Sequence, residues 1–160
     1  MMNVTIIFVG KLKEKYLVDC CNEYLKRLSV LCKMNMIEIN EEKICDNPND
    51  TQINIVLQKE GERIISKIPK NSYIIPMCIE GKQLDSIEFA NKFRQVALCG
   101  KSNITFIIGG SFGLSDNVKK LADCKMSMSK MTFPHQLARM MLLEQIYRAF
   151  QIQNNSKYHK

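Results

Sequence analysis

The sequence predicts an α/β fold, in which helices cover a central sheet. Short apolar runs typical of buried strands alternate along the chain with segments whose apolar residues recur every three or four positions, as on one face of a helix. The 160 residues also make up about the length of one domain, and 46% hydrophobic with 24% charged residues is usual for a globular protein. No linker, repeat or low-complexity tract interrupts the chain, so we expect a single domain over residues 1–160.

The first half of the chain contains two expected strands and two expected helices. Residues 4–9 form an apolar run that predicts a buried strand, and residues 34–39 alternate like a second strand. Between them, apolar side chains over residues 17–31 follow steps of four and three, which predicts a helix. The polar stretch 41–51 predicts a loop, and helical spacing over residues 53–68 predicts the next helix.

The third expected strand covers residues 72–79, and Glu80-Gly81-Lys82 is its expected exit turn. Asp85 can then cap a helix that runs to about Cys99. Residues 104–108 form a strongly apolar strand that leads into a run of glycines. This order of elements continues the alternation of strand and helix.

The last part of the chain begins with a short helix capped by Ser115 or Asp116. A weak strand is expected near residues 125–129, and Pro134 ends that segment. Residues 135–153 then show the longest helical pattern of the chain, followed by a polar tail.

Charge and cysteine content limit the classes of function. The formal net charge is +7, and residues 119–160 carry +6 of it, which favours an anionic partner such as RNA over an evenly charged surface. A solvated basic face is the simpler alternative. The seven cysteines show no CxxC spacing and there are only two histidines, so we expect reduced thiols, a cytoplasmic protein and no metal site. No apolar run approaches the ~20 residues that a membrane span needs.

The glycine run GGSFG, residues 109–113, follows an apolar strand, where glycines let the backbone approach a ligand. It matches neither the Walker A sequence nor the dinucleotide fingerprint GxGxxG. The run alone therefore fits a tight turn as well as a ligand loop.

The helix over residues 135–153 projects apolar side chains almost all round, which predicts burial on most sides. A short chain cannot easily surround such a helix by itself, so we expect a homodimer. Arg139 lies beside apolar neighbours, which predicts either a buried salt bridge or a place at a functional pocket. Glu144 and Arg148 are spaced as a structural ion pair.

Both histidines, His135 and His159, lie in this last region and can move a proton near neutral pH, although capping or exposure is the simpler role for each. Tyr158, His159 and Lys160 end the chain. They form either a disordered tail or a group of a stacking ring, an imidazole and a cation suited to RNA.

Five motifs, GKLKEKY, GGSFGLS, SKMTFPHQLAR, EQIYRAF and the terminal YHK, together resemble one family over essentially the whole chain. It is the family of bacterial pseudouridine N3-methyltransferases of large-subunit ribosomal RNA, which are small SPOUT methyltransferases. The resemblance implies a parallel sheet with a carboxy-terminal trefoil knot, which no periodicity argument would predict. It also implies a homodimer, S-adenosylmethionine as methyl donor, and a pseudouridine of 23S rRNA in the assembled ribosome as substrate.

The resemblance further implies a cofactor pocket formed by three segments at one edge of the sheet. By position these residues are Met77, Gly109, Met128, Ser129, Lys130, Met131, Thr132 and Phe133.

Methyl transfer to a ring nitrogen also needs a base, and we expect His159 as the base, with Arg139 stabilising negative charge and Tyr158 beside them. His135 is expected to orient the pocket. A non-catalytic ribosome-binding factor of the same fold is the alternative, and a small nucleotide-hydrolysing domain lacks the lysine and carboxylates that it would need.

Overall fold

The computed structural model describes all residues, 1–160, and its centre is a parallel sheet of five strands in the order β2-β1-β4-β3-β5. The strands are β1 (Asn3–Val9), β2 (Lys33–Ile39), β3 (Ser72–Gln83), β4 (Asn103–Ile108) and β5 (Met126–Ser127). Every pair of neighbours is parallel, with β4 in the middle between β1 and β3. The α/β class and the parallel sheet expected from the sequence are confirmed.

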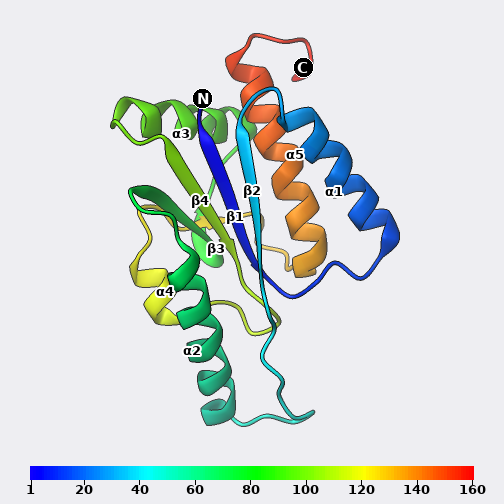
Figure 1. The fold of residues 1–160 in the computed structure, drawn as a ribbon, viewed down its shortest axis with the longest axis vertical. Helices are drawn as coiled ribbons and strands as arrows, with labels where there is room; N and C mark the ends of the chain where they lie inside the picture. The colour runs from blue at the N-terminus through cyan, green and yellow to red at the C-terminus, as the bar shows by residue number, and fades with distance from the viewer.

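Helices cover both faces of the sheet (Figure 1). They are α1 (Lys15–Leu28), α2 (Asp50–Lys67), α3 (Ser86–Leu98), α4 (Asp116–Lys120) and α5 (His135–Gln153). α5 packs between α1 and α3 on one face, and α2 packs with α4 on the other. The α5 face holds a core cluster of 19 buried residues and the other face a cluster of 7, so α5 lies over the larger core.

Local capping explains where several helices begin. Asn49 and Asp85 each accept a hydrogen bond from the backbone N–H three residues on, and each forms a complete capping box. α2 therefore starts at Asp50, before its apolar pattern becomes visible in the sequence. The short helix α4 is capped by Ser115, one of the two residues expected for that role.

The end of β3 differs from the expectation. Residues 80–82 were expected to form an exit turn, but the strand continues to Gln83. β3 bends around β5, because Met77 and Lys82 both pair with Met126, and the N–H of Lys82 donates to the carbonyl of Lys125. A side chain on Gly81 would collide with the backbone of Met126. The partner that extends β3 comes from more than 40 positions along the chain, so local sequence could not reveal it.

β5 thus lies within the bend of β3, and the chain continues from there into α5. A carboxy-terminal knot, in which this segment is threaded through a loop, stays a prediction. No helix combines the length and apolar character that crossing a membrane requires. No three side chains of the metal-ligating types His, Cys, Asp or Glu come together, and all seven cysteines are free.

Candidate active site

A cavity of about 390 Å³ lies at the carboxyl edge of the sheet. Three chain segments form most of its wall: residues 77–80 within β3, residues 108–114 from the last residue of β4 onward, and residues 127–133 except Lys130 from the last residue of β5 onward. His135 and Ala138 of α5 close one side. In open α/β sheets ligands bind outside the carboxyl ends of the strands, so this is the expected place for a small-molecule site.

Seven of the eight residues that the resemblance assigned to cofactor binding line this cavity, namely Met77, Gly109, Met128, Ser129, Met131, Thr132 and Phe133. The eighth, Lys130, is exposed and does not line it. The side chain of Ser129 accepts a hydrogen bond from the N–H of Met131 at 3.0 Å, which holds the turn that follows β5. The structure therefore brings three distant segments together as expected, while their role in binding stays a prediction.

The glycine run owes its shape to a close approach of its own backbone. A side chain on Gly109 would meet the carbonyl oxygen of Gly113, and the N–H of Gly113 donates to the carbonyl of Gly110 at 3.1 Å. Gly113 has φ of 84°, a conformation that side chains disfavour. These constraints make the run a tight turn, and the same turn forms one wall of the cavity. The tight turn is therefore confirmed, and the role of the run as a ligand loop stays a prediction.

The cavity contains little free charge. Glu80 and Lys119, its only side chains of fixed charge, bond to each other at 2.7 Å. Their hydrogen bond lowers the pKa of Glu80 and raises the pKa of Lys119. Burial raises the pKa of the Cys78 thiol, so this cysteine stays protonated at neutral pH. Recognition in the cavity thus depends on apolar side chains, hydroxyls and backbone groups, and no lysine is free to hold a phosphate.

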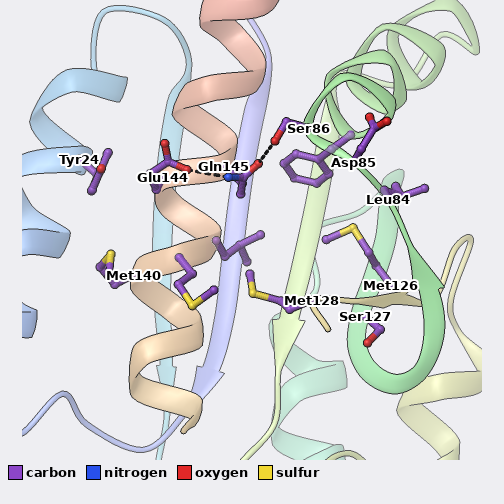
Figure 2. Close-up of a pocket in the computed structure, with 13 residues that line it drawn as sticks. Tyr24, Leu84, Asp85, Ser86, Met126, Ser127, Met128, Met140, Glu144 and Gln145 are labelled. Atoms are coloured by element: carbon purple, nitrogen blue, oxygen red, sulfur yellow. Dashed lines mark hydrogen bonds between the residues drawn. The ribbon is translucent and has the colours of Figure 1, made fainter. Parts of the chain in front are cut away.

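A second cavity, of about 610 Å³, opens between α1, α3 and α5 (Figure 2). Ser127 and Met128 line both cavities, so the two meet at β5. The wall of this second cavity is rich in methionine. On its polar side, side-chain hydrogen bonds run from Ser86 to Gln145 and from Gln145 to Glu144, each 2.7 Å long. The sequence did not predict this cavity, because its lining residues come mostly from four elements and carry no motif.

Arg139 is buried, with 2% of its surface exposed, but neither expected environment is present. No carboxylate pairs with it, which corrects the expected salt bridge, and it lines neither cavity. Its guanidinium lies 3.5 Å from the centre of the Phe8 ring and donates one hydrogen bond of 3.1 Å to the carbonyl of Gly10, while its Nε has no partner. Burial lowers the pKa of Arg139 to about 10, so it remains charged at neutral pH. An aromatic face and a carbonyl replace the carboxylate.

The carboxy-terminal tail folds back on α5. The hydroxyl of Tyr158 donates to Glu144 at 3.2 Å, and its ring meets Tyr147 edge-on at 5.0 Å. Burial, followed by hydrogen bonds to Tyr24 and the charge of Glu144, raises the pKa of Tyr158 to about 12. His159 lies against Arg148, with 3.3 Å between Nδ1 and Nη1. The tail is therefore ordered by specific contacts.

Arg148 makes contacts with the tail that the sequence did not predict. Besides its expected pair with Glu144 at 2.6 Å, its guanidinium lies 4.8 Å from the Tyr158 ring centre and contacts His159. The four-residue spacing of Glu144 and Arg148 shows that they share one face of α5. It does not show that the tail packs on that face, because the tail is not helical and its contacts follow no sequence period.

Within one chain, the tail and the first cavity lie far apart. His135 lines the cavity and Arg148 holds His159, and Arg148 follows His135 by 13 positions in α5, which corresponds to about 20 Å at 1.5 Å per residue. The structure thus gathers the cofactor candidates at one end of α5 and the candidate base, with Tyr158, toward the other. His135 is the histidine that lines the cavity itself.

Comparison with known proteins identifies the family of this chain. The family model described as "Predicted SPOUT methyltransferase" matches residues 2–159. Curated relatives at 52% identity over 159 residues, which is 99% of this chain and all of each relative, include "Ribosomal RNA large subunit methyltransferase H" of Leuconostoc mesenteroides and of Clostridium kluyveri. A protein of Methanococcus maripaludis named "Putative ribosomal RNA large subunit methyltransferase H" matches to the same extent.

Among solved structures, a probable methyltransferase from Bordetella pertussis is similar with a TM-score of 0.56 and 12% identity, covering 92% of this chain and 95% of that one. A probable methylase family protein from Haemophilus influenzae is similar with a TM-score of 0.54 and 12% identity, covering 98% of this chain and 70% of that one. These two likenesses concern the fold alone. The match to the family model and the full-length relatives show that this chain belongs to the SPOUT methyltransferase family, in its ribosomal RNA large subunit branch.

Proposed function

We propose that the protein transfers a methyl group from S-adenosylmethionine to N3 of a pseudouridine in 23S rRNA of the assembled ribosome. The observation that carries the proposal is the gathering of seven assigned cofactor residues around one cavity. The names of the full-length relatives support ribosomal RNA as the substrate class. The choice of pseudouridine, of its N3 position and of S-adenosylmethionine as donor rests on the family resemblance. A ribosomal substrate would place the protein in the cytoplasm.

The cavity fits the proposed cofactor. Its volume of about 390 Å³ falls within the range usual for small-ligand pockets. Apolar walls at Met77, Met128 and Phe133 suit an adenine ring, and the backbone around Gly109 can approach it closely. When bound, the donor supplies a methyl group on a sulfonium, which departs as a neutral thioether. The absence of a free lysine in the wall suits a cationic donor, because a lysine would repel it.

The chain must also remove the N3 proton of the target, and His159 is the proposed base. In this subunit the guanidinium of Arg148 can only donate, so the lone pair of Nδ1 faces Arg148. His159 therefore accepts the imide proton once the substrate replaces that contact. Nη1 of Arg148 can then donate to the ring that becomes negative, while the other nitrogens stay bonded to Glu144, and this position is better than that of the buried Arg139. We propose Tyr158 as a residue that holds this group in place.

Because the tail lies about 20 Å from its own cavity, we propose a homodimer in which the tail of one subunit serves the cavity of the other. Leu137, Met140 and Met141 of α5 are only half-buried in the single chain, which leaves apolar surface for a second copy. The methionine-rich second cavity lies on the same side of α5 and offers adaptable surface for that contact.

Single-turnover methylation of ribosomes that lack the modification, followed by mass spectrometry of the rRNA, tests the reaction. One pseudouridine should gain 14 mass units, the mass of a methylene. Calorimetry with S-adenosylmethionine separates this function from that of a non-catalytic ribosome-binding factor, which would bind ribosomes without the cofactor.

Subunit mixing tests the shared site. A subunit that lacks residues 158–160 and a Gly109→Ala subunit should each be inactive, and exchange between them should restore activity in the heterodimer. If mass spectrometry verifies exchange and activity stays absent, the tail does not act across the dimer.

A further inference from the structure

Residues 11–16 lie after β1 and include the first two residues of α1, and they take no part in the function proposed above. This segment carries Lys11, Lys13 and Lys15 with one glutamate and a tyrosine. Leu12 packs against the core, whereas the lysines on either side of it are exposed. The apolar residue thus anchors the segment and leaves Lys11 and Lys13 to solvent.

The exposed groups of this segment lack partners within the chain. Lys15 pairs with Asp19 at 2.8 Å, but neither Lys11 nor Lys13 forms a salt bridge. The side chain of Tyr16 is 69% exposed and stacks on no other ring. Lys11 and Lys13 are therefore unpaired cations, and they lie five and three positions before the exposed ring of Tyr16.

Two hydrogen bonds fasten the segment and the residue before it to the amino-terminal part of α5. The N–H of Lys13 donates to the side chain of Gln136 at 3.0 Å. The buried Arg139 donates to the carbonyl of Gly10, the residue just before the segment. A Cβ on Gly10 would lie 3.8 Å from Nε2 of His135, a residue of the cavity wall. In Figure 1 the segment passes beside the amino end of α5 on its way to α1.

We propose that residues 11–16 form an RNA-contacting arm, with Lys11 and Lys13 on phosphates that flank the target base and Tyr16 stacked on an unpaired neighbouring base. The inference rests on the proposed function, and it adds the part of the surface that holds the substrate. Free lysines bind phosphates with release of counterions, and exposed aromatic rings stack on bases of single-stranded RNA. The fixed position of the arm beside His135 places these contacts next to the reaction.

A second copy of the chain is the competing partner for the exposed Tyr16. A two-fold interface that brought the two arms together would place lysines against lysines, which is unfavourable. An anionic partner is therefore the better match for the arm, and the test below includes the oligomeric state.

The test compares a Lys11→Ala/Lys13→Ala variant and a Tyr16→Ala variant with two controls, Lys15→Ala and Lys67→Ala. Lys15 shares the arm but is already paired, and Lys67 is exposed at the end of α2, at the opposite edge of the sheet. The probe is the 70S ribosome purified from cells that lack the modification, and its binding is measured by co-sedimentation across a series of salt concentrations. Calorimetry with S-adenosylmethionine and light scattering accompany each variant.

The double lysine variant should bind ribosomes more weakly and lower the slope of log affinity against log salt by about 2. Tyr16→Ala should weaken binding about tenfold, the scale of one lost stacking contact. Both variants should keep cofactor affinity and dimeric mass, and both controls should bind like the wild type.

Wild-type affinity and salt slope in the double variant would overturn the proposal, and so would dissociation of the dimer by Tyr16→Ala. Failure of the proposed function looks different. The wild-type protein would then bind ribosomes without transferring a methyl group, and the comparison between variants would still decide whether the arm contacts RNA.

Discussion

Nη1 of Arg148 lies 3.3 Å from Nδ1 of His159, although the two residues belong to a helix and to the tail that folds back along it. A guanidinium can only donate, so Nδ1 of His159 accepts the hydrogen bond from Arg148 through its lone pair. The contact holds His159, the proposed base, in a defined orientation. In the proposed reaction it also keeps the cation of Arg148 beside the base.

His159→Ala should lower the single-turnover methylation rate by about 10²-fold or more, the usual contribution of a positioned base. Arg148→Lys should lower it about tenfold, because lysine retains the charge but loses the planar fork that holds Tyr158, Glu144 and the histidine at once. Quenched-flow assays with saturating cofactor measure both rates. Wild-type rates in the His159 variant would exclude this histidine as the base.

Gly109→Ala should weaken binding of S-adenosylmethionine at least tenfold, since the added methyl group would meet the carbonyl of Gly113 and displace the turn that forms the cavity wall. Gly100→Ala is the matched control. Gly100 has a positive φ, 75°, and open space around it just after α3, so its replacement should cost about 1 kcal/mol of stability and leave cofactor affinity unchanged. Isothermal calorimetry and urea denaturation distinguish the two effects.

Arg139→Ala should destabilise the fold by about 3 kcal/mol, the scale of emptying a large buried side chain, whereas Arg139→Met should cost clearly less. Methionine fills the space and removes a buried cation that lacks a carboxylate partner. Urea denaturation of both variants measures the difference. A stable Arg139→Met protein that binds cofactor but no longer transfers methyl groups would return Arg139 to the catalytic role that its sequence position suggested.

Tyr158 should titrate near pH 12, later than an ordinary tyrosine. Its folded-state pKa lies above its unfolded value, so its contribution to the docking of the tail is fully present below about pH 10 and is lost as pH rises toward 12. Ultraviolet difference titration of the wild type minus Tyr158→Phe isolates the late component. A component centred at pH 10 would mean that the tail is not docked on Glu144.

Local sequence was a good guide wherever a structure depends on neighbours along the chain. The apolar runs located the strands, and Asp85 capped the helix that follows it, because period and capping act within a few residues. The motifs of the family also located the three segments of the cavity wall. The end of β3 could not be foreseen in this way, since its hydrogen-bond partners come from β5.

The sequence by itself determined an α/β domain, its order of strands and helices, and the family whose motifs it carries. Only the tertiary structure decided the partners of Arg139 and Arg148, because each is chosen by groups that the fold brings from elsewhere: Phe8 and Gly10 for one, Tyr158 and His159 for the other. A cation needs a compensating group wherever it is buried, and the sequence shows the need but not which group meets it. The same holds for the arm of residues 11–16, whose motif is visible in the sequence and whose place beside the cavity is not.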